Sequence, residues 1–344
     1  MLNGRHGGND LALDIELDFS ANLNPYGMPE NVRRAVVASV GEWEKYPDPE
    51  CRILRSRLAE RLGVPFGNIV CGNGADDLIY RIVSAFRPGK ALVCAPSFGE
   101  YFKALYDNGC SVDIHFLEYE NVFALTESIL ERITGKDMVI LASPNNPNGL
   151  AAEPGLLSAI AERCRSADTY FLCDESFIGF AENSERLTAL NCMNEKVIVL
   201  RSFTKLFAMA GLRLGYAVCG SPETAEKIWR TGQYWSVSAP AQAAGTAALN
   251  EAGYINQTTE LIRNERKHIA AELAGMGVSV LPSDANFILF KARPELGELL
   301  LEKKILIRSC ADYAGLDESF FRTAVRTKKE NEQLLAAIRR IMNG

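Results

Sequence analysis

Residues 197–219 read VIVLRSFTKLFAMAGLRLGYAVC, and this stretch decides the fold class. It contains two short apolar runs, Val197–Ser202 and Gly215–Cys219, which flank a turn region rich in polar residues. Runs this short and this apolar are typical of strands that are buried on both faces of a sheet. The turn region carries hydroxyl and cationic side chains in close succession: Ser202, Thr204, Lys205 and Arg213. The stretch therefore predicts two buried strands with a polar site at their junction.

Similar apolar runs precede this stretch, and amphipathic segments lie between most of them. The predicted strands are Ile69–Cys71, Ala91–Cys94, Val112–Phe116, Met138–Ala142 and Tyr170–Asp174. The amphipathic segments, which we expect to form helices, are Asp76–Phe86, Leu125–Ile133 and Pro154–Arg165. Alternation of this kind is typical of an α/β protein in which helices cover both faces of a parallel sheet.

The pattern changes at both ends of the chain. The C-terminal part contains helices at Ala241–Asn250 and Glu260–Gly275, strands at Asn286–Phe290 and Ile305–Arg308, and a last helix at Lys329–Met342. The first forty-odd residues carry the loop FSANLNPYG and a predicted helix near Pro29–Val40. We therefore predict a large domain over residues 45–240. A small domain, formed by residues 1–44 and 241–344, includes an N-terminal entry segment.

The composition argues against several classes of function. The 344 residues carry a net charge of −6, which disfavours a general nucleic-acid binder. The nine cysteines include no CxxC pair and there are only three histidines, so we predict no metal site. No apolar run reaches bilayer length, and we predict a cytoplasmic protein that does not bind membranes. The sequence also lacks GxGxxG, GxxxxGK and GxSxG motifs, which removes the usual support for hydride transfer, nucleotide hydrolysis and serine-triad chemistry.

The residues that can carry chemistry follow the predicted strands at their carboxyl ends, where open α/β sheets place ligands. Small residues at 72–75 precede a helix and leave backbone N–H groups free to bind an anion. Asn146 lies in the turn SPNNPNG, and Asp174 ends a strand. Lys205, partly desolvated beside the cation of Arg213, should have a lowered pKa.

The motifs GNGADD, APSF, SPNNPNG, CDESF and RSFTKLFAMAGLRLGY together resemble the large domain of fold type I pyridoxal-phosphate enzymes, the aminotransferase superfamily. FSANLNPYG, KYPDP, DANFILF and FFRTAVRT resemble its small-domain and entry-loop segments, so the resemblance covers the whole chain. It implies a mostly parallel seven-stranded sheet flanked by helices, with a small α+β domain built from both chain ends. It also implies a homodimer whose active sites are shared between the subunits.

The resemblance also implies roles for individual residues. Lys205 is expected to bind pyridoxal 5′-phosphate covalently, and Asp174 to pair with the ring nitrogen, which keeps the ring an electron sink. Asn146 is expected to bond the phenolic oxygen of the ring, and Phe98 to stack on its face. The residues expected around the cofactor phosphate are Gly74, Ala75, Asp76, Ser202, Thr204 and Arg213, with Tyr46 from a partner subunit. Arg322, in FFRTAVRT, is expected to clamp a substrate carboxylate with its guanidinium.

One position departs from the pattern of many aminotransferases. They place a tyrosine three residues after the ring aspartate, where this chain has Phe177. Two groups of the superfamily therefore compete: histidinol-phosphate aminotransferases, and the threonine-phosphate decarboxylases of cobalamin biosynthesis. The decarboxylases favour phenylalanine at that position, and they share segments like RHGGND (5–10), DFSANLNPYG (18–27) and ILIRSCADYAGL (305–316).

We therefore predict an enzyme acting on a phosphorylated amine or amino acid, with decarboxylation of threonine phosphate as the first choice. Transamination of histidinol phosphate, with 2-oxoglutarate as acceptor, is the alternative. The substrate phosphate would lie near the entry loop, where the candidate ligands are His6, Asn9, Asn24 and Arg308. A regulatory module that binds the cofactor is disfavoured because no helix-turn-helix segment is attached. A catalytically inactive scaffold is disfavoured because Lys205 and Asp174 are intact.

Overall fold

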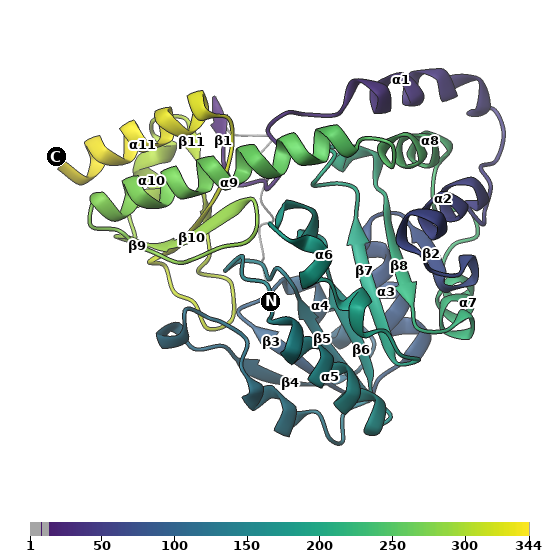
Figure 1. Cartoon of the computed structure of the whole chain (residues 1–344). Coiled ribbons are helices and arrows are strands. Elements are labelled where there is room, and N and C mark those ends of the chain that lie inside the picture. The colour runs from purple at the N-terminus through teal and green to yellow at the C-terminus, as the bar shows by residue number, and fades with distance from the viewer. Residues whose placement is uncertain (1–7, 9–13, 344) are drawn as a thin grey trace.

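The computed structural model describes residue 8 and residues 14–343, and its largest element is a seven-stranded sheet of order β2-β8-β7-β6-β5-β3-β4 (Figure 1). The strands are β2 (Ile69–Gly72), β3 (Lys90–Ala95), β4 (Ser111–Phe116), β5 (Met138–Ala142), β6 (Tyr170–Asp174), β7 (Val197–Ser202) and β8 (Gly215–Cys219). Only β8 of this sheet runs antiparallel to its neighbours, β2 and β7. The predicted α/β fold with a mostly parallel seven-stranded sheet is confirmed.

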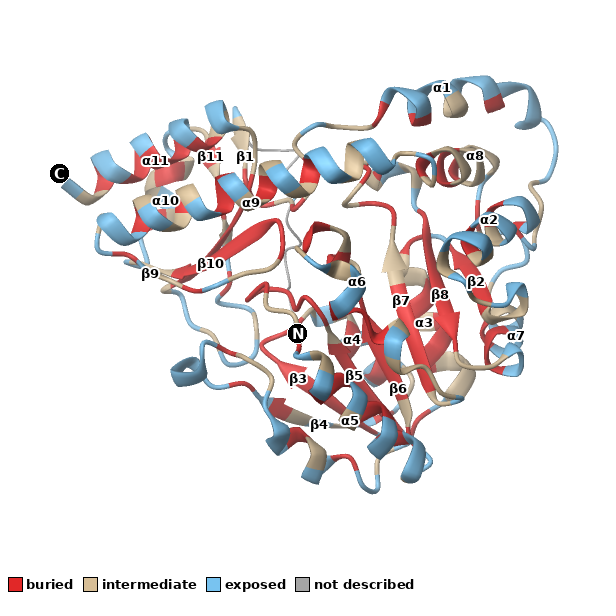
Figure 2. Ribbon diagram, in the orientation of Figure 1, coloured by how far each residue is buried: buried red, intermediate tan, exposed pale blue. Residues whose placement is uncertain are grey.

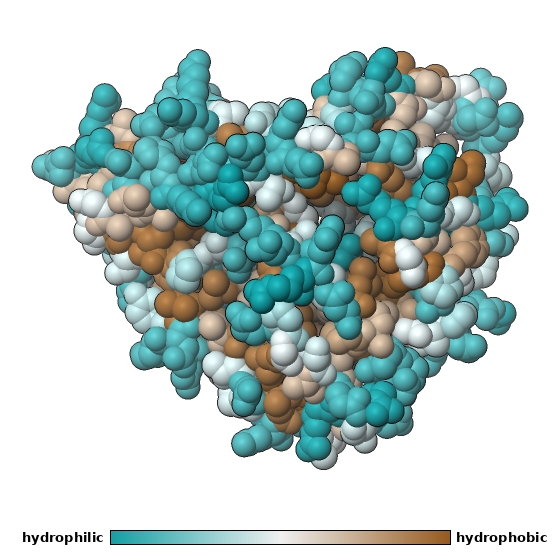
Figure 3. Space-filling model, in the orientation of Figure 1, coloured by the Kyte–Doolittle hydropathy of each residue, from teal (hydrophilic) through white to brown (hydrophobic). Residues whose placement is uncertain are grey.

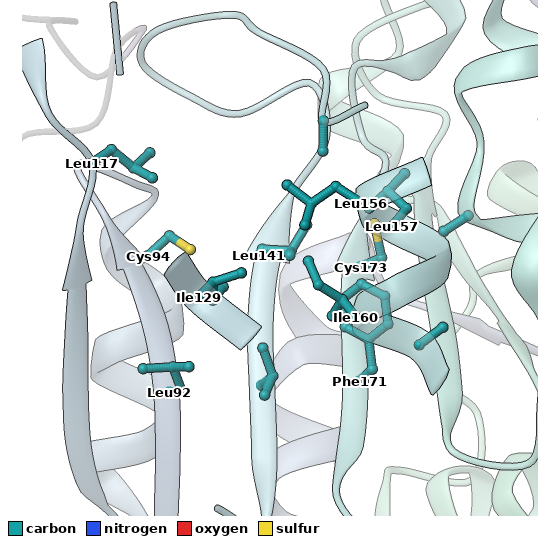
Figure 4. Close-up of a cluster of buried hydrophobic side chains, with 14 of the residues drawn as sticks. Leu92, Cys94, Leu117, Ile129, Leu141, Leu156, Leu157, Ile160, Phe171 and Cys173 are labelled. Atoms are coloured by element: carbon teal, nitrogen blue, oxygen red, sulfur yellow. The ribbon is translucent and has the colours of Figure 1, made fainter. Parts of the chain in front are cut away.

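Helices cover both faces of this sheet because its central strands present apolar side chains to both sides, in alternation, whereas the edge strand β4 is partly exposed. One face packs, through residues such as Ile140 and Leu172, against α3 (Ala75–Phe86), α4 (Gly99–Asp107) and α7 (Pro222–Thr231). The other face packs, through residues such as Leu141 and Phe171, against α5 (Pro154–Ser166) (Figure 4). The strands are therefore buried between two layers of helices whose outer sides are exposed (Figure 2).

One segment of this region was predicted to form an α-helix but forms a different type of helix. The segment Leu125–Ile133 contains a 3-10 helix, Glu127–Arg132, in place of an α-helix. Left-handed backbone at Phe123 (φ 57°) and Gly135 (φ 77°) bounds the segment, which leaves room for a short helix only. Its buried side chains still cover the sheet, since Ile129 is fully buried in the same cluster as α5.

A second sheet of four strands, in the order β12-β13-β10-β9, is built from the C-terminal part of the chain. Its strands are β9 (Ser279–Val280), β10 (Phe287–Lys291), β12 (Arg308–Ser309) and β13 (Phe320–Ala324). The helices α9 (Ala252–Gly275), α10 (Leu296–Leu301) and α11 (Lys328–Asn343) share one apolar cluster with it. Phe19 joins this cluster, and β1 (Leu17–Asp18) pairs in parallel with β11 (Ile305–Leu306). Residues from both ends of the chain thus pack together, although β13 was not foreseen as a strand.

A further apolar cluster joins three helices to the β2–β8 edge of the large sheet. The helices are α1 (Glu30–Ala38), α2 (Arg52–Leu62) and α8 (Ala239–Ala248), while the short α6 (Ser184–Leu187) lies elsewhere, after β6. Helices on both sides of the proposed domain boundaries, at residues 44/45 and 240/241, share this cluster. The division of the chain into two domains at these positions stays a prediction.

Residues 14–343 contain neither a helix long and apolar enough to cross a membrane nor a group of histidine, cysteine, aspartate and glutamate residues that could bind a metal ion. All nine cysteines are free thiols. Hydrophilic side chains dominate over α9 and α11, along the top of the face shown in Figure 3.

The burial pattern of the large sheet predicts that replacing two of its phenylalanines will lower the free energy of unfolding by different amounts. Phe171 of β6 is fully buried, whereas Phe116 at the end of the edge strand β4 is 54% exposed. Replacing Phe171 by Ala should lower the free energy of unfolding by about 3–5 kcal/mol, because it removes buried surface and leaves a cavity. Phe116→Ala should cost about 1 kcal/mol or less. Urea unfolding followed by circular dichroism measures both, and equal losses would contradict the burial pattern.

Candidate active site

The carboxyl ends of β5, β6 and β7 open onto a cavity of about 310 Å³, and the C-terminal sheet forms its other wall. The large sheet and its helices contribute Ala75, Asp76, Phe98, Glu100, Tyr101, Asn146, Asp174, Ser176, Phe177, Ser202, Thr204, Lys205 and Arg213. The chain ends contribute Ser20, Ala21, Asn22, Arg308, Tyr313 and Arg322. A larger and more open groove, of about 1130 Å³, shares Ser176 and Ser202 with this cavity but is not lined by Lys205 or Asp174. The enclosed cavity is therefore the candidate active site.

Lys205 lies in the loop that follows β7, and its amine is held in a partly desolvated, cationic environment. Burial and, to a lesser extent, the positive charges of Arg322 and Arg213 together lower the pKa of Lys205 to about 8, against the opposing effect of the Asp174 carboxylate. An amine with this pKa is largely neutral just above physiological pH and can then act as a nucleophile. The environment confirms the expected direction of the shift, with Arg322 added to Arg213 as its cause.

Asp174 is the last residue of β6, and 5% of its surface is exposed. Its Oδ2 accepts a hydrogen bond from the Tyr101 hydroxyl at 2.6 Å, and its Oδ1 accepts one from the Ser176 backbone N–H at 2.8 Å. Burial raises the pKa of Asp174, while these hydrogen bonds and the charge of Lys205 lower it. The carboxylate therefore sits where a cationic ring nitrogen would stabilise its charge.

An anion site lies at the N-terminus of α3. Gly74 caps this helix with φ of 91°, and a Cβ built on it would come within 2.6 Å of Arg213 Nη2. The positive φ favours glycine here, and the missing Cβ leaves room for the Arg213 guanidinium against the helix start. The hydroxyl groups of Ser202 and Thr204 face the same side, 2.7 Å apart. Backbone N–H groups, hydroxyls and a guanidinium together make the donor set that a phosphate needs.

Asn146 and Arg322 are joined across the cavity wall. Arg322 Nη1 donates to Asn146 Oδ1 at 2.5 Å and to the Tyr313 hydroxyl at 3.4 Å, and its Nη2 donates to the Ser20 carbonyl at 2.7 Å. Tyr313 also donates to Asn146 Oδ1, at 3.3 Å. Because the amide oxygen of Asn146 accepts both bonds, its amide nitrogen remains available to a ligand. Arg322 Nε is buried and has no hydrogen-bond partner among the described residues.

Arg308 faces Arg322 directly across the antiparallel pair β12–β13. Residues opposite each other on antiparallel strands project to the same side of the sheet, so two guanidinium groups line one wall of the cavity. Arg308 Nη2 is held by Asp312, at 2.8 Å from Oδ1 and 2.6 Å from Oδ2. The Asp312 carboxylate thus offsets part of the repulsion between two like charges at this position.

Three residues predicted for the site, Asn24, Tyr46 and Gly74, do not line the cavity of their own chain, and of these Tyr46 was expected to come from a partner subunit. Asn24 does not line the cavity, because its amide bonds the Leu206 carbonyl at 2.8 Å and the Thr258 hydroxyl at 2.7 Å. Tyr46 is 77% exposed and does not reach the cavity of its own chain. Gly74 lies immediately behind the lining residue Ala75. His6 and Asn9 lie outside the residues that the structure describes.

Tyr101, Tyr313 and Asn22 are among the cavity residues that the sequence reasoning missed. Tyr101 lies one helical turn after Phe98, Tyr313 lies in the quoted run 305–316, and Asn22 lies two positions before Asn24. The amide oxygen of Asn22 is buried and has no hydrogen-bond partner in the described structure. The signal was available for Tyr101, since it stands at helical spacing from a residue already expected at the site. Nothing in the sequence shows which asparagine of SANLN faces the cavity.

The residues present fit pyridoxal 5′-phosphate. The cradle at Gly74 would be filled by any Cβ, the neutralisable amine of Lys205 can join an aldehyde, and the buried carboxylate of Asp174 needs a cationic partner. Fold and site together define a pyridoxal-phosphate enzyme with the fold of the aminotransferases. Residues 14–338 match the family described as aminotransferase class I and II, and the chain belongs to this family.

Individual relatives show which members of the family this chain is similar to. The chain is 38% identical to the threonine-phosphate decarboxylase of Salmonella typhimurium over 100% of its own length and 98% of that protein. It is 34% identical to histidinol-phosphate aminotransferase 2 of Archaeoglobus fulgidus, over 94% of this chain and 93% of that one. The crystal structure of the histidinol-phosphate aminotransferase from Clostridium acetobutylicum superposes with a TM-score of 0.90 and 30% identity, covering 95% and 99% of the two chains.

The charge environment of Lys205 predicts how the apoenzyme takes up its cofactor. The neutral amine attacks the aldehyde, so the rate of combination should rise with pH through a midpoint near the lowered pKa of about 8. Stopped-flow absorbance between neutral and alkaline pH measures this rate. Arg322→Met should move the midpoint upward, because it removes a positive charge that lowers the Lys205 pKa. A wild-type midpoint near the ordinary lysine value of about 10.4 would contradict the burial of the amine.

Proposed function

We propose that this enzyme removes the carboxylate of L-threonine O-3-phosphate as CO₂ and releases aminopropanol phosphate, a step of cobalamin biosynthesis. The similarity to the Salmonella decarboxylase over the full length of both chains supports this choice. The alternative is transamination of histidinol phosphate, which is supported by the relatives and the solved structure that bear that name.

The paired arginines Arg308 and Arg322 are the observation that carries the proposal. They project from directly opposite positions of β12 and β13 into one cavity. Threonine phosphate bears two anionic groups, a carboxylate and a phosphate, and each can engage one guanidinium. Histidinol phosphate bears only one anionic group, because its phosphate is esterified to the CH₂ group that replaces the carboxylate, and its side chain is an imidazole. Two adjacent guanidinium groups thus fit the amino-acid phosphate better than the amino-alcohol phosphate.

Phe177 provides a second, weaker argument. It lines the cavity, and its ring packs edge-on against Phe287, with 4.9 Å between centroids. A phenylalanine cannot donate a hydrogen bond, so this position offers the cofactor an apolar wall where many aminotransferases offer a hydroxyl. The hydrogen bond to the phenolic oxygen of the cofactor would then come from the amide nitrogen of Asn146.

In the proposed reaction the protein groups orient the substrate and move one proton. Arg322 would bind the substrate carboxylate and thereby set the orientation of the Cα–carboxylate bond that is to break. When bound, pyridoxal phosphate supplies the electron sink for the pair that the departing CO₂ leaves behind. Asp174 keeps that sink effective by holding a proton on the ring nitrogen. Lys205 Nζ then delivers a proton to Cα, which completes the amine product.

The choice of substrate is tested by two parallel incubations of the holoenzyme. With threonine phosphate we expect release of CO₂ and formation of aminopropanol phosphate. With histidinol phosphate and 2-oxoglutarate we expect no glutamate. Lys205→Ala is the control and should abolish turnover, because no other described lysine lines the cavity. Glutamate from the second incubation, without CO₂ from the first, would replace the proposed function with its alternative.

We also propose that the enzyme is a homodimer with shared active sites. Large apolar side chains are exposed along α1 and the segment after it, and they include Val37, Val40, Trp43 and Tyr46. Tyr46 stacks on Trp235 at 4.1 Å between ring centroids, which holds it outward and away from the cavity of its own chain. Exposed apolar patches of this kind are typical of subunit interfaces. Docked on a second copy, Tyr46 can reach the phosphate of the partner's cofactor.

Mixing inactive variants tests the shared sites. Lys205→Ala and Tyr46→Ala should each be impaired, but co-refolding them in equal amounts should restore about a quarter of the wild-type activity, because half of the dimers carry one intact site. Lys205→Ala mixed with Asp174→Ala is the matched control. Both of those residues line the same cavity, so no intact site can form. Equal recovery in the two mixtures would argue against sites shared through Tyr46.

The cellular location is proposed on the state of the cysteines. All nine are free, and eight of them are buried. Such a set is typical of proteins in a reducing compartment, so we propose that the enzyme works in the cytoplasm.

A further inference from the structure

Tyr101 makes a contact with the site that none of the roles above explains. It lies on α4, 1% of its surface is exposed, and its hydroxyl donates to Asp174 Oδ2 at 2.6 Å. We propose that Tyr101 is a positioning residue of this enzyme, which acts through Asp174 to fix the orientation and the negative charge that the cofactor's ring nitrogen requires. Tyr101 would thus tune the cofactor without being a proton donor to the substrate.

The geometry of the carboxylate supports this role. Asp174 Oδ2 accepts a hydrogen bond from the Tyr101 hydroxyl and Oδ1 accepts one from the Ser176 backbone N–H, and the Ser176 side chain also bonds the carboxylate. These donors restrict rotation of the carboxylate about its Cβ–Cγ bond, and the remaining lone pairs can be directed into the cavity. An O–H···O⁻ bond of 2.6 Å is in the range of charge-assisted hydrogen bonds, which are about twice as strong as neutral ones.

The Tyr101 ring is itself held in place by the residue expected to cover the cofactor face. Phe98 precedes α4 as its N-cap, and the rings of Phe98 and Tyr101 meet edge-on at 5.6 Å and 82°. The Tyr101 backbone N–H also donates to the Phe98 carbonyl, at 3.4 Å. One turn at the start of α4 therefore places both the stacking ring and the hydroxyl that bonds the carboxylate.

The surrounding charges show why the hydroxyl matters. Lys205 is the cation that acts on the pKa of Asp174, and the other titratable groups that act on the pKa of Tyr101 are Asp174, the Cys173 thiol and the Tyr313 phenol. Burial favours the neutral form of Asp174, and the Tyr101 hydrogen bond counteracts it. Without the hydroxyl, Asp174 would hold its proton more tightly, and a proton kept on the carboxyl is no longer held on the ring nitrogen. Burial and the charge of Asp174 also raise the pKa of Tyr101, so its hydroxyl stays protonated as a donor.

Tyr101→Phe removes only the hydroxyl and is the direct test. A hydrogen bond to a charged group is worth enough that kcat should fall about 10- to 100-fold, with KM within about twofold of wild type. The Kd of the apoenzyme for pyridoxal phosphate should rise about tenfold, and the pH midpoint of the bound cofactor's visible absorbance should shift. The Kd and the absorbance are measured without substrate, so they remain informative whichever amine the enzyme turns over.

Tyr254→Phe is the matched control. The Tyr254 hydroxyl on α9 also makes a 2.6 Å hydrogen bond, but its acceptor is the backbone carbonyl of Gly27 and it does not line the cavity. We expect it to change thermal stability while kcat, the cofactor Kd and the absorbance midpoint stay at the wild-type values. If Tyr101→Phe behaves in the same way, the proposed positioning role is overturned and Tyr101 is purely structural.

A double-mutant cycle tests whether Tyr101 acts through Asp174. The Kd for pyridoxal phosphate is measured for Tyr101→Phe, for Asp174→Asn and for the double variant. Because the first change acts only through the second group, we expect the double variant to bind as Asp174→Asn does, within about twofold. Fully additive losses would overturn the proposal, even if Tyr101→Phe alone weakens binding.

Discussion

Parallel pairing of β5, β6 and β7 is the constraint on which the rest of the site depends. Ala142 pairs with Asp174, and Asp174 pairs with Leu200, so the three strands end at nearly the same level. The loops that leave these ends carry the amide of Asn146 and the amine of Lys205 to either side of the Asp174 carboxylate. A slip of one residue in β6 would turn the aspartate to the other face of the sheet. The apolar side chains that α3, α4 and α5 cover fix the register.

Much of the large sheet could be predicted because its strands are nearly uniformly apolar and bounded by glycine or polar turns. Met138–Ala142, Tyr170–Asp174, Val197–Ser202 and Gly215–Cys219 have the predicted limits in the structure. The strand β13 (Phe320–Ala324) was not predicted, because its sequence contains Arg322 and Thr323, which do not look like buried residues. Both are buried, because hydrogen bonds compensate the loss of water: Arg322 donates to the Ser20 carbonyl of another segment, and Thr323 Oγ1 donates to the adjacent Ala324 carbonyl.

The candidate site likewise contains residues that the sequence could locate and residues that it could not. The residues at strand ends, such as Asp174 and Lys205, could be located because strand ends are a fixed feature of the fold. Asn22 and Asn24 could not be told apart, because only the tertiary path of the FSANLNPYG loop decides which side chain faces the cavity. That path is set by distant partners of Asn24, namely Leu206 and Thr258, which no local pattern identifies.

Arg322 has a consequence for how the two ends of the chain are held to the middle. Its guanidinium bonds the Ser20 carbonyl near the chain start and the Asn146 side chain after β5, while its own backbone belongs to β13. One side chain thus connects three stretches of polypeptide that are remote in sequence. An anion that binds this guanidinium therefore engages a group that all three stretches share, so the anion site exists only when the two chain ends and the middle of the chain are assembled.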